Sequence, residues 1–223
     1  MSGKRIRSYP GSELTVRYDA DRCIHAAECV RGLNRVFNPD ASPWITPDGA
    51  SADEVAAVID RCPSGALSHD LPAERRKTAP AVPVPAELSI CAGGPVYVHG
   101  EVVLVTPDGE PAGHETRLAL CRCGASAHKP FCDDSHRDAL FSDPGGIDRQ
   151  TGDVPASVGP LTLTPLPNGP VLLRGPFVLT SADGSCEFRG DKAALCRCGA
   201  SANKPFCDGA HARIGFQADG AAS

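Results

Sequence analysis

Two short stretches of the chain hold cysteine and histidine at the same spacing, C-x-C-x8-C-x3-H. The candidate ligands are Cys121, Cys123, Cys132 and His136 in the first stretch, and Cys196, Cys198, Cys207 and His211 in the second. Thiolate and imidazole are ligands for zinc and for iron–sulfur clusters. Two cysteines one residue apart point to opposite sides of an extended chain, so they converge only in a bent loop or bind different corners of an extended inorganic core. The spacing therefore predicts a metal centre and argues against a disulfide between them.

The residues around the third cysteine are suited to shaping such a loop. Pro130 and Pro205 come two residues before this cysteine and bend the chain. Asp133 and Asp208 follow it directly, where a carboxylate could cap the short helix that carries the histidine. The Asp-x-x-His spacing also predicts that this carboxylate lies near the imidazole and orients it.

A second set of cysteines lies nearer the N-terminus. Cys23 and Cys29 are spaced C-x5-C, and Cys62 follows after a gap and precedes Pro63. Three thiolates without a fourth suit a 3Fe–4S cluster, or a 4Fe–4S cluster whose remaining iron takes hydroxide or another side chain. The adjacent His25 is a candidate for that fourth ligand. The alternative is three ordinary thiols in a helical cap.

Composition favours small domains held together by metal. The 223 residues include 11 Cys, 21 Pro and 23 Gly but only 5% aromatic residues, and small units with small cores usually need a metal or disulfides. The N-terminus lacks the apolar segment of a signal peptide, and no apolar stretch approaches the roughly 18 residues of a membrane span. We therefore expect a cytoplasmic protein, in which clustered cysteines bind metal. The net charge of −5 gives no indication of nucleic-acid binding.

The chain also repeats itself over a distance of 75 residues. The segment GPVYVHGEVVLV at 94–105 aligns without a gap with GPVLLRGPFVLT at 169–180, upstream of the two Cys/His stretches. Both segments alternate β-branched or apolar residues with others, and Asp108-Gly109 and Asp183-Gly184 follow as hairpin-turn signals. Two repeats are too few for a solenoid, so we predict a tandem pair of β-rich units.

The N-terminal unit has a different pattern. LTVRY at 14–18 predicts a strand, and Ser51 with Glu54 predicts a capping box that opens a helix. The apolar face of that helix would run from Val55 to Cys62, and Pro63 would end it just after Cys62. We predict an α+β chain with an N-terminal unit at 12–71, a Pro-rich linker at 72–87, a first β-rich unit at 88–142, a linker at 143–159 and a second β-rich unit at 160–218.

The two Cys/His stretches resemble the CDGSH iron–sulfur domain of the mitoNEET-like family, whose motif is C-x-C-x2-S/T-x3-P-x-C-D-G-S/A/T-H. Ser126 and Ser201 stand at the Ser/Thr position, and the second copy reads CDGAH. The first reads CDDSH, with Asp134 at the glycine position, and Asp tolerates a positive φ at modest cost. The resemblance implies a 2Fe–2S cluster with three cysteines and one histidine in each copy. It also implies that the copies pair within the chain as a pseudo-dimer, leaving a monomer.

The N-terminal cysteines resemble a divergent one-cluster ferredoxin in which the middle cysteine of the bacterial C-x2-C-x2-C run is missing. Ala26 stands at that position. This resemblance implies a third cluster, 3Fe–4S or 4Fe–4S, bound by Cys23, Cys29 and Cys62.

Together these patterns predict an electron carrier without its own substrate pocket, because no nucleophile elbow, phosphate loop or dinucleotide fingerprint occurs. Its partner would be a redox protein or a cluster acceptor, with no nucleic acid and no membrane involved. Two alternatives remain open. A histidine ligand must be neutral to bind, so a labile cluster would suit a cluster carrier or a redox or iron sensor. A purely structural zinc protein would also use Cys3His ligation, although usually with C-x2-C or C-x4-C spacing.

Overall fold

The computed structural model describes residues 6–75, 81–148 and 159–220. The chain divides into two compact units, Met1–Ala81 and Val82–Ser223, and each is described by itself. No helix in the described ranges has the length and apolar character to cross a membrane.

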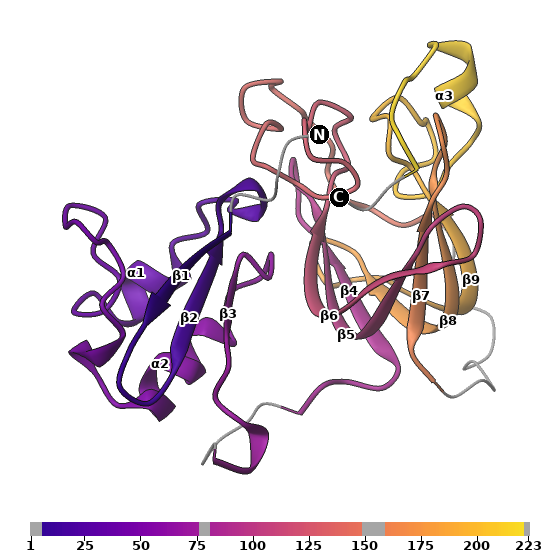
Figure 1. The fold of residues 1–223 in the computed structure, drawn as a ribbon. Coiled ribbons are helices and arrows are strands. Elements are labelled where there is room, and N and C mark those ends of the chain that lie inside the picture. The colour runs from indigo at the N-terminus through magenta and orange to yellow at the C-terminus, as the bar shows by residue number, and fades with distance from the viewer. Residues whose placement is uncertain (1–5, 76–80, 149–158, 221–223) are drawn as a thin grey trace. The chain divides into compact units, whose positions relative to one another are not determined.

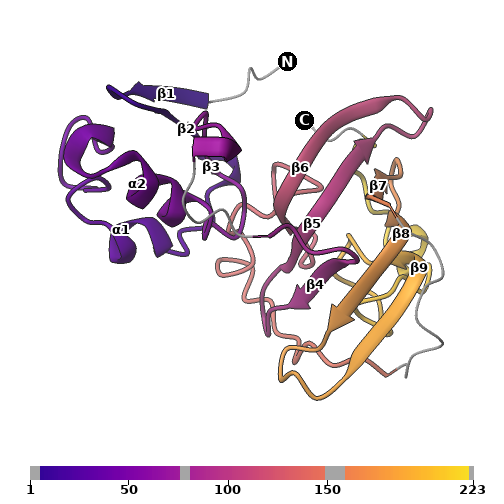
Figure 2. The same ribbon diagram turned by 90° about the horizontal axis from the view of Figure 1, so that it is seen from below.

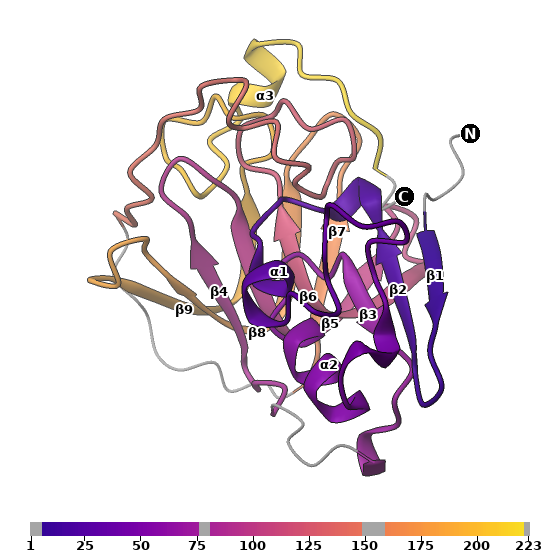
Figure 3. The same cartoon turned by 90° about the vertical axis from the view of Figure 1, so that its left-hand side faces the viewer.

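The first unit is built on a three-stranded antiparallel sheet with the order β1-β2-β3. The strands are β1 (Ile6–Pro10), β2 (Thr15–Asp19) and β3 (Leu67–His69), and the strand predicted at 14–18 is confirmed as β2. Two helices, α1 (Glu28–Gly32) and α2 (Ala52–Ile59), lie on one side of this sheet (Figure 2, Figure 3). Three short 3-10 turns complete the unit: η1 (Ala20–Arg22), η2 (Pro47–Gly49) and η3 (Ala73–Arg75).

Helix α2 has the N-terminus that the sequence predicts but ends earlier. The Ser51 hydroxyl accepts from the Glu54 amide at 3.4 Å, and the Glu54 carboxylate accepts from the Ser51 amide at 3.0 Å, so the capping box is confirmed. The prediction that the helix reaches Cys62 is wrong, because it ends at Ile59 and Cys62 lies in the following turn. Pro63 explains the difference, since the residue before a proline is disfavoured in the helical conformation.

The second unit is a six-stranded sheet that contains both repeats. The first repeat gives β4 (Ala86–Ile90), β5 (Val96–Val105) and β6 (Pro111–Leu120); the second gives β7 (Leu161–Pro165), β8 (Val171–Thr180), β9 (Glu187–Leu195) and the short helix α3 (Ala210–Arg213). β5 pairs with β6 and β8 with β9 as antiparallel hairpins. The turns predicted at Asp108-Gly109 and Asp183-Gly184 are therefore confirmed.

Each repeat contributes its first strand to the other repeat. β4 pairs antiparallel with β5 of its own repeat and parallel with β8 of the second (Figure 2). β7 does the reverse, pairing antiparallel with β8 and parallel with β5. The strands β4, β5, β7 and β8 thus form a closed circuit of pairings. Its interior is one apolar core with side chains from both repeats, among them Leu88, Val102, Leu163 and Leu179.

This arrangement differs from the predicted boundaries in two respects. β4 begins at Ala86, inside the predicted linker 72–87, so the β-rich part starts earlier. The predicted units 88–142 and 160–218 share one core and are not separate compact bodies. The middle parts of the two predicted linkers, 76–80 and 149–158, lie outside the described residues. Within the second unit, the loops that follow β6 and β9 lie at the same end of the sheet (Figure 1, Figure 3).

Candidate metal centres

The first Cys/His stretch forms a loop closed by a short strand-like pairing. β6 ends at Leu120, which forms an isolated bridge with Phe131. The Cys121 amide donates to the Pro130 carbonyl at 2.8 Å, and the Cys132 amide donates to the Ala119 carbonyl at 2.7 Å. Because these bonds bring the end of β6 alongside residues 130–132, the third cysteine lies beside the first two although it is separated from them in sequence.

The four side chains of this first site fall into two pairs. The Sγ atoms of Cys121 and Cys123 are 3.7 Å apart, and Cys132 Sγ lies 3.4 Å from His136 Nδ1. Two sulfur ligands about 2.3 Å from one tetrahedral metal ion are separated by about 3.8 Å. Each pair therefore has the spacing of two ligands on one metal, and the two pairs fit a core with two metal ions. No group of three or more His, Cys, Asp or Glu in the described part of the chain gathers at the spacing of a single bound ion.

The second site repeats this backbone arrangement. The Cys196 amide donates to the Pro205 carbonyl and the Cys207 amide to the Ala194 carbonyl, both at 2.8 Å. Cys196 and Cys198 have their Sγ atoms 3.7 Å apart, as in the first copy. His211 lies in α3, four residues beyond Cys207. The same local contacts thus bring the three predicted cysteines together in both copies.

The acid–base properties of the first site show what a metal would displace. A hydrogen bond between the Cys121 and Cys123 side chains, together with burial, raises the pKa of Cys121. The same bond lowers the pKa of Cys123 to about 6. Burial raises the pKa of Cys132 to about 12. Without metal, Cys121 and Cys132 keep their protons at neutral pH, so metal binding by three thiolates must release protons and weakens as the pH falls.

The histidine of the first site is oriented by a carboxylate other than the predicted one. Asp134 Oδ1 lies 3.5 Å from His136 Nε2 and 2.9 Å from Arg137 Nε, which leaves Nδ1 directed at Cys132. The prediction that Asp133 has this role is wrong. Its carboxylate instead accepts from the Ala127 amide at 2.8 Å and from the Ser135 hydroxyl at 2.6 Å, so it joins two segments of the ligand loop.

Asp208 joins the matching segments of the second site. It accepts from the Ala202 amide at 3.0 Å and from the Ala210 amide, the first of helix α3, at 2.9 Å. The predicted role for Asp208 at the start of the helix is thus partly met, although Gly209 is the residue in the N-cap position. Asp134 has φ 74° and Gly209 has φ 81°, so the expectation that Asp takes over a left-handed glycine position is confirmed.

The two ligand loops touch each other through their backbones. A Cβ atom on Gly124 would lie 2.3 Å from the Cys198 carbonyl oxygen, and one on Gly199 would lie 2.2 Å from that of Cys123. Both glycines also have left-handed φ angles, +81° and +79°. Only glycine permits this approach, so the two sites are in direct backbone contact. The sequence prediction missed both residues, although each recurs at the same place in the two copies.

Two buried arginines were also missed. Arg122 and Arg197 lie between the first two cysteines of each motif and are 2% and 1% exposed. Arg122 donates to the carbonyls of Gly94 and Cys91 and to the Asp143 carboxylate. Fully buried arginines are rare and need partners. Their recurrence in both copies was the available signal, but a C-R-C sequence does not itself indicate burial.

The N-terminal cysteines line one narrow cavity in the first unit. Cys23 follows η1, Cys29 lies in α1 and Cys62 follows α2, and all three border this cavity together with His25 and Ala26. Three thiols around one cavity are a suitable donor set for a cluster with three cysteine ligands. The loop between Cys23 and Cys29 contains two left-handed residues, His25 with φ 51° and Ala27 with φ 61°.

Burial and neighbouring side chains distinguish the groups in this cavity. The Tyr18 hydroxyl is hydrogen-bonded with Cys23, and burial together with this bond raises the pKa of Tyr18. Burial also raises the pKa of Cys29. A wider cleft of about 1160 Å³ adjoins Cys23 and Cys29 and is lined by aromatic residues such as Tyr9 and Trp44. The sequence does not predict this cleft.

Comparison with known families accounts for both parts of the chain. The family described as a divergent 4Fe-4S mono-cluster matches residues 9–70, which include the three N-terminal cysteines. The family described as an iron-binding zinc finger of CDGSH type matches residues 93–137 and 168–212, which include all eight ligands of the two motifs. These matches confirm the two resemblances seen in the sequence.

Two curated relatives match the N-terminal part of the chain. The uncharacterized protein YjdI of Escherichia coli strain K12 is 43% identical over 63 residues, which are 28% of this chain and 83% of that protein. The protein of the same name from Escherichia coli O157:H7 gives the same values. No solved structure matches the chain significantly.

Proposed function

Since this chain belongs to the divergent 4Fe-4S mono-cluster family in its N-terminal part and carries two CDGSH-type iron-binding domains behind it, we propose that it is an iron–sulfur electron-transfer protein. Each CDGSH-type domain would hold a 2Fe–2S cluster, and the N-terminal unit a 3Fe–4S or 4Fe–4S cluster. When bound, such clusters supply reversible one-electron reduction. The partner would be a redox protein, and the chain would act without a substrate of its own.

The observation that carries this proposal is the paired arrangement of the first site. The thiols of Cys121 and Cys123 would bind one iron, and Cys132 with His136 would bind the other, because each pair has the spacing of two ligands on one ion. The Asp134 carboxylate would hold the proton on His136 Nε2 and so keep Nδ1 free to bind.

The strand exchange supports a pseudo-dimer within one chain. β4 and β7 each complete the sheet of the other repeat, and the glycines of the two ligand loops meet backbone to backbone. The two sites would therefore be held in a fixed relation by one core, and the protein would work as a monomer. Burial of Cys121, Cys132 and Cys196 would keep water from these three sulfur ligands, which matters because solvent exposure changes a cluster's potential.

The third cluster would be bound by Cys23, Cys29 and Cys62. Its ligand set stops at three thiolates because Ala26 stands in place of a further cysteine. His25 borders the same cavity and is the nearby side chain that could complete a 4Fe–4S site. The Tyr18 hydroxyl would donate to the Cys23 sulfur and thereby favour the reduced state.

The test is a count of iron and sulfide per chain combined with electron paramagnetic resonance of the purified protein. A 2Fe–2S centre gives a signal when reduced, whereas a 3Fe–4S centre gives one when oxidised. We expect two signals of the first kind and a distinct third centre. A colourless protein that contains zinc and no sulfide would refute the proposal.

A cluster carrier is the second candidate, favoured by the single histidine in each ligand set. A ligand that can be protonated makes a cluster easier to release. Mixing the loaded protein with an apo-ferredoxin separates the two functions. Rapid loss of cluster to the acceptor indicates a carrier, whereas retention with reversible reduction indicates electron transfer.

A further inference from the structure

Asp143 and Ala218 occupy equivalent positions in the two halves of the second unit. Each is 75 residues from the other and each follows its histidine ligand by seven residues. The Gly93 amide donates to the Asp143 carbonyl at 2.8 Å, and the Asn168 amide donates to the Ala218 carbonyl at the same distance. The two positions share this backbone contact and differ in their side chains, a carboxylate in one half and a methyl group in the other.

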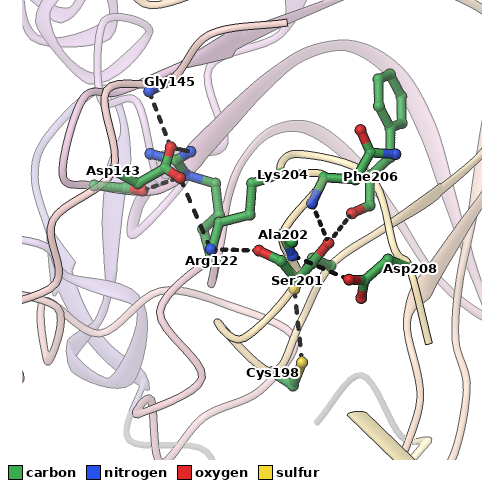
Figure 4. Close-up of polar contacts among 12 residues, drawn as sticks. Arg122, Asp143, Gly145, Cys198, Ser201, Ala202, Lys204, Phe206 and Asp208 are labelled. Atoms are coloured by element: carbon green, nitrogen blue, oxygen red, sulfur yellow. Dashed lines mark hydrogen bonds and ion pairs between the residues drawn. The ribbon is translucent and has the colours of Figure 1, made fainter. Parts of the chain in front are cut away.

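The Asp143 carboxylate contacts basic groups from both ligand loops (Figure 4). It accepts from Arg122 Nη1 in the first loop, and its other oxygen lies 3.9 Å from Lys204 Nζ in the second. The Lys204 ammonium also donates to the Ser201 carbonyl at 2.6 Å, three residues beyond Cys198. All three charged side chains are mostly buried, with 15% of Asp143, 1% of Arg122 and 17% of Lys204 exposed.

The matching place in the other half has no such carboxylate. Arg197 donates to four backbone carbonyls, those of Gly169, Asp219 and Leu166 at 2.6 to 3.0 Å and that of Ala218 at 3.4 Å. Lys129 donates to the Ser126 carbonyl and lies 5.7 Å from the centre of the Phe216 ring. The Asp219 side chain is exposed. Within the described ranges, no carboxylate forms an ion pair with Arg197 or Lys129.

The motifs themselves add to this difference. Residues 121–144 contain three basic and four acidic residues, whereas residues 196–219 contain three basic and two acidic residues. Asp134 in the first copy faces Gly209 in the second, and Asp143 faces Ala218. The two halves therefore share their loop pattern but differ in charge at several positions after the third cysteine, among them Asp134/Gly209, Asp138/Arg213 and Asp143/Ala218.

We propose that Asp143 is a positioning residue that makes the two CDGSH-type sites electrostatically unequal, so that their clusters have different reduction potentials. This inference rests on the proposed function, in that both motifs must hold clusters. An electron given up by a partner would then reduce one cluster of the two in preference, leaving the other oxidised. The same molecule would take up its two electrons in a fixed order.

The physical reason is that one negative charge cannot act equally on two centres unless it lies midway between them. A carboxylate disfavours the added electron and lowers the potential of any nearby cluster. Asp143 is bonded to Arg122 but only approaches Lys204, so its position relative to the two ligand loops is uneven. A second carboxylate at position 218 would act on the sites in the opposite proportion and cancel the part of the inequality that Asp143 causes.

The test uses Asp143→Asn, Ala218→Asp and the double variant, each as the full cluster-loaded chain. Ala218 and Lys129 both line a cleft of about 380 Å³, so the added carboxylate has room near a base. Redox titration followed by electron paramagnetic resonance gives the two potentials of each protein. Asp143→Asn should raise their mean and Ala218→Asp should lower it. The separation of the two potentials should change by the same amount and in the same sense in both single variants, and twice as far in the double variant.

We expect the difference between the two potentials to change by the equivalent of about a threefold change in the ratio of reduced to oxidised cluster. One partly buried charge at unequal distances from two centres has an effect of this order. A tenfold ratio corresponds to about 59 mV for one electron. Asp108→Asn, in an exposed hairpin turn, is the control and should change neither value. An unchanged separation in both single variants would overturn the inference while leaving the proposed function intact. A protein without clusters in the two motifs would instead overturn the proposed function.

Discussion

The backbone contact between the two ligand loops can be tested by adding one methyl group. In Gly124→Ala the new Cβ would lie 2.3 Å from the Cys198 carbonyl oxygen, closer than real Cβ contacts occur, and the backbone φ is +81°. The left-handed conformation costs a non-glycine residue about 1–2 kcal/mol. Moving one loop away from the other adds about 1–3 kcal/mol, the usual cost of overpacking. We therefore expect Gly124→Ala to lose about 2–5 kcal/mol of stability.

The matched control is Gly109→Ala in the first hairpin turn. Gly109 also has a left-handed φ, +91°, but nothing lies within 4 Å of a Cβ at that position. It should lose only the conformational part, about 1–2 kcal/mol. The assay is the thermal unfolding midpoint of the loaded protein, which shifts by roughly 2–4 °C for each kcal/mol at this size. If Gly124→Ala and Gly199→Ala destabilise no more than Gly109→Ala, the two loops do not touch and the described pairing of the repeats is wrong.

Four further predictions concern the clusters and one hairpin. His136→Cys and His211→Cys should make the two C-terminal clusters stable to acid and lower their potentials, because thiolate replaces imidazole; unchanged bleaching near about pH 6 would count against histidine ligation. Cys62→Ser should remove one spectroscopic component and leave two, and loss of all three would show that the units depend on each other. Ala26→Cys should supply a fourth thiolate, so that the N-terminal centre becomes 4Fe–4S and any 3Fe–4S signal disappears; a persistent 3Fe–4S signal would argue against the assigned position of the missing ligand. Hydrogen bonds from Ser181 and Ser185 lower the pKa of Asp183 from 3.8 to about 2. The ionised carboxylate therefore stabilises the folded protein above about pH 4, and this stabilisation is lost as the pH falls towards 2. The difference in thermal midpoint between wild type and Asp183→Asn should shrink over that interval, and a constant difference would contradict the assignment.

Local patterns were sufficient to predict strand β2 and the two hairpins of the β-rich unit. The alternation around Val98 and Leu173 and the Asp-Gly turns are short-range signals, and the β5–β6 and β8–β9 hairpins follow from them. The capping box at Ser51 was equally local. The end of α2 was predicted too late because the apolar face pointed to Cys62, whereas the conformational effect of Pro63 reaches back along the chain.

The exchange of β4 and β7 was beyond sequence reasoning. β4 is as compatible with its own β5 as with β8 in the other repeat, and nothing in its five residues specifies a parallel partner far along the chain. Burial of Arg122 was similarly hidden, because its acceptors are carbonyls and a carboxylate from three separate segments. The positive φ of Asp134, in contrast, was predictable from the sequence, because Asp134 stands at the glycine position of the family motif.

The strand exchange has a consequence for how the two halves can evolve. In a homodimer every substitution occurs twice, at positions related by the symmetry axis, so the two subunits cannot acquire different residues. Here the two halves are joined in one polypeptide, so their association is intramolecular and does not depend on protein concentration. A substitution in one half leaves the other unaltered. Because the two halves are covalently joined, they can hold different residues at equivalent positions, which the subunits of a symmetric homodimer cannot. Asp143 and Ala218 are such a pair.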